Sequence, residues 1–502
     1  MPEMRVTPIE ELDVVVVGAG LSGICAGHHL QAAAPWASYA ILEGRNAIGG
    51  TWDLFRYPGV RSDSDMFTLG FPFRPWTSDR MIVDGASIKR YIEQTAADEG
   101  IDKHIRFGHR VTSASWDTME GRWRLTAEGP DGPVDFRCRF FFSCTGYYSY
   151  EQGHRPSFAG EERFSGTFVH PQHWPEELDY RGKRVVVIGS GATAVTLVPA
   201  MAEEAALVTM LQRSPTYVAS VPARNPVVGA LQRVLPARMA ANATRWAHAL
   251  GTQGMYVFSR RHPKLVRAAL KQMVKRQLPA GYAIDPHFTP RYDPWDERMC
   301  AVPGGDLFKA IASGRAEVVT DEIDSFTETG ILLRSQRELE ADIVVTATGL
   351  ELLFIGGIEL RVDGERVDVA GRLTYKGMML EGLPNFAFAI GYTNASWTLK
   401  CDLSAAYVAR LLNHMRATAR WMCTPRNDDP NLESKPILEM RSGYIARAAG
   451  LMPAQGSRFP WQVHQSFVRD YRAMRLGGVE DGAMRFDEIP AGAPVSATID
   501  AA

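Results

Sequence analysis

Two glycine-rich turns, each between a strand-like and a helix-like segment, constrain the fold of this chain more than any other feature. The first follows the β-branched run Val14 to Val17, precedes a helix-like stretch over 24–34, and reads Gly18, Ala19, Gly20, Leu21, Ser22, Gly23. The second follows a strand-like run over 184–188, precedes helical composition over 192–206, and reads Gly189, Ser190, Gly191, Ala192, Thr193, Ala194. A strand, a tight glycine turn and a helix in this order open a βαβ dinucleotide-binding unit. The sequence therefore predicts an α/β protein with two Rossmann-like dinucleotide-binding domains.

The first turn has the spacing of a phosphate-binding loop. Glycine stands at the tight turn, at the point where a pyrophosphate approaches, and where the helix meets the strand. The next strand-like run ends at Glu43, and a carboxylate there can hold the ribose hydroxyls of an adenosine that lacks a 2′-phosphate. FAD carries such a ribose. We therefore predict that the first unit binds FAD through Gly18, Gly20, Ser22, Gly23 and Glu43.

The second turn differs from the first in two places. Alanine replaces the third glycine, and the strand-like run 207–211 is followed by Gln212, Arg213 and Ser214 rather than by an acid. A guanidinium at this position suits a 2′-phosphate. We therefore predict NADPH on the second unit, held by the six residues of the turn together with Arg213 and Ser214. The alternative is that Arg213 is an ordinary surface arginine.

Two further strand-like runs, over 140–146 and 342–349, each end in a Thr-Gly pair where the chain would pass between domains. We include Gly146, Thr348 and Gly349 among the predicted cofactor-binding residues. The predicted organisation is a first part of the FAD-binding domain over 1–150, an NADPH-binding domain over 151–350, and a second part of the FAD-binding domain with a C-terminal tail over 351–502.

A helical insert is predicted within the NADPH-binding domain, over about 225–280. Between Gln212 and Ile284 the chain has twelve Lys or Arg and no Asp or Glu. This composition predicts a basic helical surface. It is either a solvated face or an element that attaches weakly to an anionic membrane surface.

Composition and charge exclude several classes of protein. With 45% hydrophobic and 22% charged residues the chain suits a folded globular protein, and a net charge of -2 gives no bulk affinity for nucleic acid. The first residues lack the pattern of a signal peptide, and no apolar run reaches the roughly 18 residues that cross a bilayer. Six scattered cysteines without a Cys-x-x-Cys pair indicate neither a metal site nor a redox dithiol. We therefore expect a cytoplasmic protein without a metal, with peripheral membrane attachment as the alternative that the basic insert raises.

Two longer motifs carry a resemblance to a known family. The segment between the two units fits Phe-x-Gly-x-x-x-His-x-x-x-Trp followed by Pro or Asp, at Phe164, Gly166, His170, Trp174 and Pro175. Residues 49–63 fit Gly-Gly-x-Trp, four residues, Tyr or Phe, Pro, Gly, three residues and Asp. Both are fingerprints of the Baeyer-Villiger monooxygenases, which are class B flavoprotein monooxygenases, and the chain resembles that family over about residues 10–420. Residues 49–66, 287–300 and 391–403 resemble those of the subgroup that contains a mycobacterial ethionamide-activating monooxygenase.

The resemblance implies a set of catalytic and flavin-contacting residues. Arg298 would stabilise a negatively charged peroxyflavin, because a guanidinium is permanently charged and offers no readily transferred proton. Arg291 is the competing assignment, and an ion pair with Asp296 or Glu297 is the alternative role for Arg298. Asp63 would lie beside the flavin and orient the catalytic arginine. By the same resemblance further residues would contact FAD: Gly50, Thr51, Trp52, Asp53, Leu54, Tyr57 and, at the adenine, Val111.

One position departs from the family pattern. Better-known ketone monooxygenases have lysine before the catalytic arginine and use it at the 2′-phosphate, whereas this chain has Glu297. A carboxylate cannot make that contact, so selectivity for NADPH would rest on Arg213 and Ser214. We expect His170 to act as a hinge or hydrogen-bonding residue rather than as a general base, because it lies in the linker.

The resemblance implies an FAD-dependent, NADPH-consuming Baeyer-Villiger monooxygenase. Such an enzyme inserts one oxygen atom of O2 next to a ketone carbonyl, through a C4a-peroxyflavin, and releases an ester or a lactone. Sulfoxidation of thioethers is also expected, and the substrate would be a small apolar ketone or thioether. The nearest alternative is a flavin monooxygenase that oxidises nitrogen or sulfur without carbonyl chemistry. A disulfide reductase would need a partner for Cys25 at a spacing that the sequence lacks.

Overall fold

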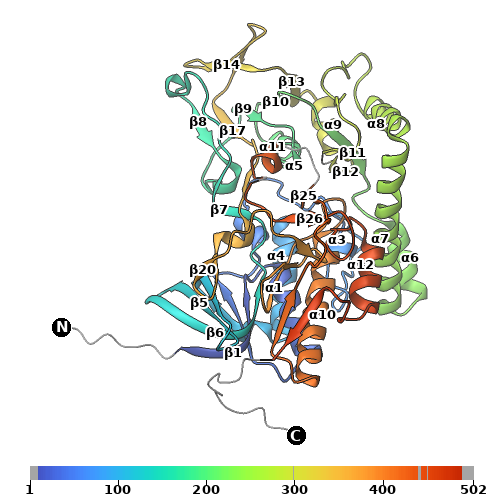
Figure 1. The fold of residues 1–502 in the computed structure, drawn as a ribbon. Coiled ribbons are helices and arrows are strands. Elements are labelled where there is room, and N and C mark those ends of the chain that lie inside the picture. The colour runs from blue at the N-terminus through green and yellow to red at the C-terminus, as the bar shows by residue number, and fades with distance from the viewer. Residues whose placement is uncertain (1–8, 298, 439–442, 449, 489–502) are drawn as a thin grey trace, which may run out of the picture.

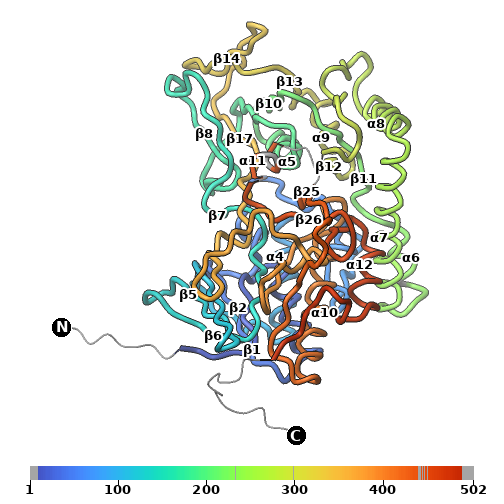
Figure 2. The backbone as a smooth tube through the Cα atoms, in the orientation of Figure 1, coloured from blue at the N-terminus to red at the C-terminus, as the bar shows by residue number. Residues whose placement is uncertain are grey.

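The computed structural model describes residues 9–297, 299–438, 443–448 and 450–488. Figures 1 and 2 show two lobes, each built around its own sheet, with the described ends of the chain in the same lobe. This lobe contains a nine-stranded sheet, which includes strands from early and late parts of the sequence. Its strands are β1 (Glu10–Val17), β2 (Tyr39–Glu43), β3 (Ile105–Phe107), β4 (Arg110–Asp117), β5 (Arg122–Gly129), β6 (Gly132–Ser143), β19 (Glu359–Val362), β20 (Glu365–Arg366) and β23 (Phe386–Phe388).

The central strand of this sheet is buried on both faces. Val14 and Val16 of β1 pack in one core cluster with the helices α1 (Leu21–Ala33) and α10 (Trp397–Ala417). Val15 and Val17 pack in a second cluster on the other face. Successive side chains of a strand point to opposite faces, so an unbroken β-branched run is what a central parallel strand requires. The strand β1 pairs in parallel with β2 and β6, which places its carboxyl end beside the first glycine turn.

The other lobe contains a five-stranded sheet whose strands pair in parallel. Its strands, in spatial order, are β13 (Ala316–Thr320), β10 (Leu207–Gln212), β9 (Arg184–Ile188), β17 (Ile343–Thr346) and β8 (Thr167–Val169). The helices α5 (Ala192–Met201) and α9 (Asp306–Ala312) share a core cluster with one face of this sheet. The second glycine turn connects β9 to α5, so the predicted fold class, α/β with two Rossmann-like units, is confirmed.

Three helices run along one edge of the molecule and connect the lobes (Figure 1). They are α6 (Pro226–Val234), α7 (Ala237–Arg261) and α8 (Pro263–Gln277). The helix α8 contacts β11 (Tyr217–Val221) beside the five-stranded sheet. The helix α7 contacts α3 (Met66–Leu69) and α12 (Phe467–Tyr471) in the other lobe.

The remaining elements are short or cover the sheets. The helices are α2 (Thr51–Leu54), α4 (Gly85–Asp98) and α11 (Gly443–Arg447), with single turns over Ile101–His104, Glu161–Arg163, Pro171–His173, Phe354–Gly357 and Arg472–Leu476. The strands are β7 (Tyr148–Gly153), β12 (Met299–Pro303), β14 (Ile323–Phe326), β15 (Gly330–Leu333), β16 (Glu338–Glu340), β18 (Leu350–Leu352), β21 (Thr374–Tyr375), β22 (Met379–Leu380), β24 (Met422–Pro425), β25 (Ser434–Pro436), β26 (Ala454–Gly456) and β27 (Met484–Asp487). Among the described helices, none is both long enough and apolar enough to span a bilayer. The final dozen residues, where we predicted a tail, lie outside the described residues.

Candidate cofactor and active site

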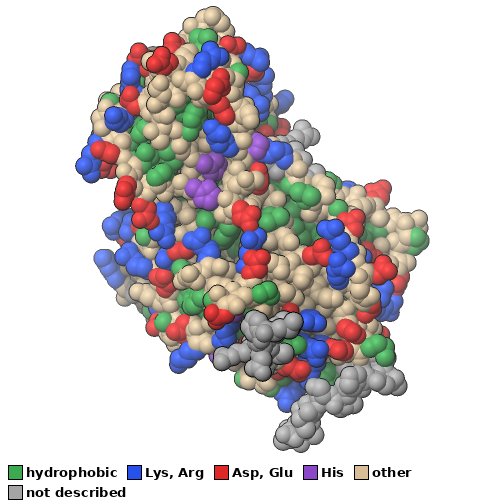
Figure 3. All heavy atoms as spheres, turned by 90° about the vertical axis from the view of Figure 1, so that its left-hand side faces the viewer, with side chains coloured by type: hydrophobic (Ala, Val, Ile, Leu, Met, Phe, Trp, Pro, Cys, Tyr) green, Lys and Arg blue, Asp and Glu red, His purple; other side chains and the backbone are tan. Residues whose placement is uncertain are grey.

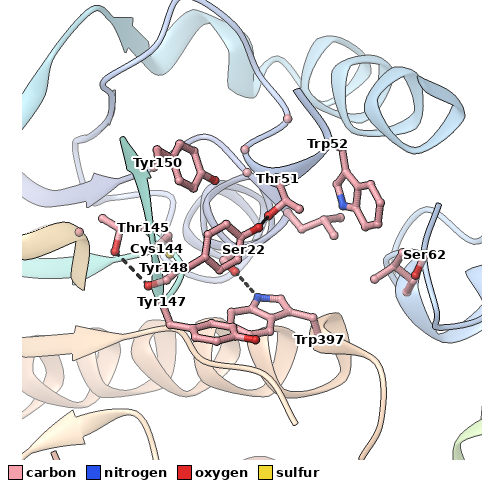
Figure 4. A pocket seen from close by; sticks show the side chains of 18 of the residues that line it. Ser22, Thr51, Trp52, Ser62, Cys144, Thr145, Tyr147, Tyr148, Tyr150 and Trp397 are labelled. Carbon is pink, nitrogen blue, oxygen red and sulfur yellow. Dashed lines mark hydrogen bonds between the residues drawn. The ribbon is translucent and has the colours of Figure 1, made fainter. Parts of the chain in front are cut away.

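A cavity of about 650 Å³ is lined by residues of both lobes, and Figure 4 shows part of its wall. The first lobe provides most of the lining, while the second provides Ala192 and Thr196 at the start of α5, and Trp295 and Met299. Twelve predicted site residues line this cavity: Gly18, Gly20, Ser22, Glu43, Gly50, Thr51, Trp52, Tyr57, Asp63, Val111, Gly146 and Ala192. The fold therefore brings residues from widely separated parts of the sequence to one place.

The first glycine turn has no room for side chains at two of its three glycines. Gly18 has φ +104°, and a Cβ there would lie 2.6 Å from the carbonyl oxygen of Cys144. A Cβ at Gly23 would lie 1.8 Å from the carbonyl oxygen of Gly18. The helix α1 begins after Gly20 without a side-chain cap, so the amides of its first turn are available to an anion. These features suit the pyrophosphate of a dinucleotide.

Glu43 lies at the carboxyl end of β2 and is only 6% exposed. Its two carboxylate oxygens accept hydrogen bonds from the backbone amides of Ala19, at 2.7 Å, and Arg45, at 2.9 Å. Burial raises the pKa of Glu43, which the two amides and the Arg45 charge partly oppose. The carboxylate is thus held in a fixed position at the cavity wall, where hydroxyl donors of a ribose would be suitable further partners.

The segment 49–54 contributes to the cavity unevenly. Thr51 is hydrogen-bonded to the hydroxyl of Tyr148, and Trp52 also lines the cavity. Asp53 and Leu54, which we predicted to line the flavin, do not line it. Asp53 is 3% exposed and pairs with Lys89 at 2.8 Å and Arg45 at 2.5 Å. Burial alone would raise the pKa of Asp53, but these two cations outweigh it and hold the pKa below its usual value.

Tyr57 and Gly59 join this segment to the second nucleotide unit. Tyr57 packs in the core cluster of the second lobe, and burial raises the pKa of its hydroxyl to about 12. Gly59 has φ +75°, and a Cβ there would lie 2.7 Å from the Cβ of Ala200. The second fingerprint thus packs directly on α5. This contact explains why a glycine occupies position 59.

An aromatic wall that sequence reasoning missed closes one side of the cavity (Figure 4). The rings of Tyr147 and Trp397 are stacked with their centroids 5.2 Å apart, and the indole of Trp397 donates a hydrogen bond to Ser22 at 2.9 Å. Tyr148 and Tyr150 also line the cavity. The run Tyr147, Tyr148, Ser149, Tyr150 directly follows the predicted Thr-Gly strand end, and that position could have indicated it. No local pattern placed Trp397 at the cavity.

The second glycine turn is more open than the first. Gly189 has φ +142°, and a Cβ there would lie 2.3 Å from the carbonyl oxygen of Ala347. The helix α5 also begins without a side-chain cap. The hydroxyl of Ser190 donates to the carbonyl of Ser214 at 2.9 Å, which brings the turn beside Arg213. Arg213 is exposed, and the described part of the chain offers it no ion pair. Of the six residues of this turn, Ala192 alone lines the cavity described above, and Arg213 does not line it.

Thr348 and Gly349 lie at the crossing between the lobes. The hydroxyl of Thr348 donates to the backbone carbonyl of His154, and the amide of His154 donates to the carbonyl of Gly349 at 3.0 Å. Gly349 has φ +111°. Unlike Gly146, these two residues do not line the cavity, so the structure places them at the linker.

The linker fingerprint is held by packing. Phe164 is 8% exposed, and a Cβ at Gly166 would lie 2.4 Å from its ring. A Cβ at Gly153 would lie 2.0 Å from the ring of His170. Nδ1 of His170 accepts a hydrogen bond from the backbone amide of Gln172 at 3.2 Å. Burial lowers the pKa of His170. Trp174 packs against the core of the second lobe, and Pro175 follows it. None of these five fingerprint residues lines the cavity.

Comparisons with known proteins agree with this geometry. Residues 66–357 match the family described as flavin-binding monooxygenase-like, and residues 16–79 match a NAD(P)-binding Rossmann-like domain. The FAD-containing monooxygenase EthA of Mycobacterium tuberculosis is 52% identical over 483 residues, which cover 96% of this chain and 99% of that protein. EthA of Mycolicibacterium smegmatis is 49% identical, with 95% and 97% covered. The chain belongs to the flavin-binding monooxygenase-like family.

The fold of this monooxygenase is shared with a solved monooxygenase structure. A steroid monooxygenase bound to NADP superimposes with a TM-score of 0.75 at 22% identity, covering 95% of this chain and all of that one. The predicted family and enzyme class, a flavoprotein monooxygenase, are confirmed, and the predicted cofactors, FAD and NADPH, agree with both comparisons.

The proposed catalytic pair of the monooxygenase is described only in part. Asp63 is exposed and lines the cavity, whereas Arg298 lies outside the described residues. Its neighbours Trp295 and Met299 line the cavity. Asp296, one of the two alternative partners of Arg298, forms an ion pair with Arg260 at 2.5 Å. Burial, followed by the Asp296 charge, raises the pKa of Glu297.

Proposed function

We propose that this flavin monooxygenase is a Baeyer-Villiger enzyme that uses FAD, NADPH and O2 to convert a small apolar ketone into an ester or a lactone. The observation that carries the proposal is the cavity itself, because its wall contains Gly18, Gly20 and Ser22 of the first glycine turn together with Ala192 and Thr196 of α5. The fingerprint over 164–175 connects the two units that form it.

The residues of the first glycine turn suit FAD, and those of the second turn with Arg213 suit NADPH. Gly18 and Gly20 line the cavity at the uncapped start of α1, where a pyrophosphate would bind, and Gly23 allows α1 to pack closely on the backbone of Gly18. The buried carboxylate of Glu43 would accept hydrogen bonds from ribose hydroxyls. The uncapped start of α5 and the exposed guanidinium of Arg213 offer the matching partners for a nucleotide with a 2′-phosphate. Bound FAD would supply the oxygen chemistry, and the protein would supply position, charge and exclusion of water.

In this proposal Arg298 and Asp63 control charge at the reacting centre. Arg298 would hold negative charge through a group that stays protonated at every working pH. Asp63 would orient that guanidinium from the cavity wall. The aromatic wall of Tyr147 and Trp397 would keep water from one side of the cavity.

Sulfoxidation of thioethers is the second proposed activity, because the same oxidant in its protonated form transfers oxygen to soft nucleophiles such as sulfur. Product analysis tests both activities. The enzyme is supplied with NADPH, isotopically labelled O2 and a panel of linear, cyclic and aryl ketones with one thioether. The proposal requires esters or lactones that carry one labelled oxygen atom. Sulfoxide formation without any ester would assign the protein to the heteroatom-oxidising flavin monooxygenases instead.

The variant Arg298→Ala tests the role of the arginine. We expect FAD binding and flavin reduction by NADPH to be unaffected, while ester formation is lost and NADPH oxidation yields hydrogen peroxide. Arg291→Ala is the matched control, and it should leave ester formation intact. Normal ester formation by Arg298→Ala would remove Arg298 from the mechanism.

A further inference from the structure

One face of α7 is apolar, exposed and free of charge. The side chains of Met239, Leu250 and Phe258, which we call the outer stripe, are 59%, 49% and 43% exposed. Their spacing of eleven and eight residues places them on one side of a helix. The ring of Trp246 instead packs against Phe467 and Tyr471 of α12 in the first lobe, with centroids 5.2 and 5.1 Å apart. The only Lys, Arg, Asp or Glu between 239 and 259 is Arg245, which is buried. A solvent-facing helix usually carries charges on this side, so the stripe is suited to a binding partner.

The opposite face of α7 is fastened to the first lobe. The guanidinium of Arg245 donates to the backbone carbonyls of Phe67, Thr68 and Gly70 at 3.2, 3.1 and 2.6 Å. Nδ1 of His248 lies 3.4 Å from a carboxylate oxygen of Asp65. These contacts fix the rotation of the helix about its axis. The outer stripe therefore lies on the far side of α7 from these contacts and cannot turn inward without breaking three buried hydrogen bonds.

Positive charge flanks the stripe at both ends. Six cations on the three helices are exposed. Among the ion pairs of the described residues, none joins these cations to an acid. The six are Arg233, Arg238, Arg261, Lys264, Lys275 and Arg276. No Asp or Glu occurs anywhere between Gln212 and Ile284. Three further apolar side chains are exposed on α6 and α8, namely Val227, Val234 and Leu265, at 60%, 82% and 60%.

Another face of the molecule has a mixed charge. The face shown in Figure 3, a quarter turn from Figure 1, has Lys and Arg interspersed with Asp and Glu. The helices α6, α7 and α8 instead run along the opposite edge, as Figures 1 and 2 both show. The surface formed by these three helices thus combines an apolar stripe with uncompensated positive charge.

We propose that this surface docks the protein onto an anionic lipid bilayer, with the outer stripe in the headgroup region and the cations against lipid phosphates. An amphipathic basic helix with an apolar face is the element that binds such an interface. A second copy of the chain is a poorer occupant, because a twofold contact would bring the same six cations together without an acid between them. Docking through this surface does not depend on the reaction that the enzyme catalyses.

The docking helix also reaches the active site. Thr252 of α7 follows Arg245 by two helical turns and His248 by one turn, which places it on the fastened face, and it lines the cavity. Docking through the outer stripe would therefore hold the cavity within one helix diameter, about 10 Å, of the lipid surface. Apolar molecules dissolved in the bilayer are the class of substrate that this position favours.

Vesicle sedimentation with the FAD-loaded enzyme tests the proposal. Vesicles of phosphatidylglycerol and phosphatidylcholine are compared with vesicles of phosphatidylcholine alone, at about 0.05 M and about 0.5 M salt. We expect sedimentation with the anionic vesicles at low salt and at least about a tenfold loss at high salt. Absence of binding to anionic vesicles at low salt would overturn the proposal.

Two variants locate the contact. Replacing Met239, Leu250 and Phe258 together by serine should weaken vesicle binding at least about tenfold, and Arg261→Gln with Lys264→Gln should weaken it about 25-fold, at about fivefold for each charge. Met119→Ser, at a side chain 52% exposed in the turn after β4, and Lys435→Gln are the matched controls, and they should bind like the parent. Equal binding by all variants would overturn the assignment of the surface. Loss of a lipid-free dimer in the serine variant, in sedimentation velocity without vesicles, would assign the stripe to a second copy instead.

Discussion

The two glycines at the start of α1 should respond to alanine in opposite ways, although they lie three residues apart in one motif. A Cβ at Gly23 would lie 1.8 Å from the carbonyl oxygen of Gly18, which is 1.2 Å inside the 3.0 Å limit that real contacts respect. A Cβ at Gly20 would lie 3.6 Å from the nearest atom, the Cα of Gly50, which is ordinary contact. Gly20 also has φ −81°, a value open to alanine.

The expected effect of Gly23→Ala is a loss of stability. Alanine gains about 1 kcal/mol over glycine within a helix, whereas forced overpacking costs about 1 to 3 kcal/mol and more when the neighbour is backbone. The oxygen of Gly18 cannot rotate away as a side chain could, so the overlap dominates. We expect a net loss of about 2 kcal/mol and a decrease in Tm of about 4 to 8 °C.

Gly20→Ala should leave the stability of the FAD-free protein within about 0.5 kcal/mol of the parent. Its methyl group would instead occupy the cavity at the uncapped start of α1, where the pyrophosphate is proposed to bind. We expect FAD to bind at least about tenfold more weakly, which corresponds to about 1.4 kcal/mol.

Thermal unfolding of the FAD-free proteins and titration of FAD by fluorescence quenching measure the two effects separately. An unchanged Tm for Gly23→Ala would show that the backbone yields more easily than the geometry indicates. Parent-like FAD affinity for Gly20→Ala would refute the placement of the pyrophosphate.

Three further predictions test other contacts. Arg213→Ala should raise the KM for NADPH at least about tenfold and the KM for NADH much less, because a charge-assisted hydrogen bond contributes about 1.5 to 3 kcal/mol. Steady-state kinetics with both coenzymes measures the two changes, and equal changes would place the 2′-phosphate elsewhere. Asp53→Asn should lower the free energy of unfolding by about 1.5 to 3 kcal/mol at pH 7. Because Lys89 and Arg45 hold the pKa of Asp53 below its usual value, this stabilisation is present above the unfolded pKa of about 4 and is lost as the pH falls through the lower folded pKa. Urea unfolding should therefore distinguish the variant from the parent at pH 7 but not at about pH 2. Arg245→Met should lower the free energy of unfolding, measured in urea, by about 2 to 4 kcal/mol, because it leaves the carbonyls of Phe67, Thr68 and Gly70 without their donor. The control Arg245→Lys should lower it less. Equal losses in the two variants would mean that packing alone matters.

Local sequence signals were sufficient for the parts of the site that one short segment builds. The first glycine turn and Glu43 lie close together along the chain, and the physical demand on each position is local: a tight turn, a close helix and an acid at a strand end. The same holds for the second turn and its neighbour Arg213. The structure brings the residues of each unit together because a βαβ unit has a fixed geometry.

Contacts between distant segments could not be read in the same way. Asp53 belongs to a correctly recognised motif, yet the structure turns it to Lys89 and Arg45 rather than to the cavity. Trp397 lies 375 residues from Ser22 and still donates a hydrogen bond to it. The partner of each side chain depends on how α10 and α4 pack on the sheet, and no periodicity in either segment encodes that arrangement.

The sequence by itself determined the two nucleotide units, the family and the basic character of the insert, because turn geometry, strand burial and charge are set by neighbours along the chain. Only the tertiary structure decided which motif residues face the cavity and which hold the fold. It alone also decided that α7 is fastened through Arg245, so that its uncharged side faces outward. The physical reason is that orientation about a helix axis is chosen by long-range contacts, and a single segment contains only one of the two surfaces that meet.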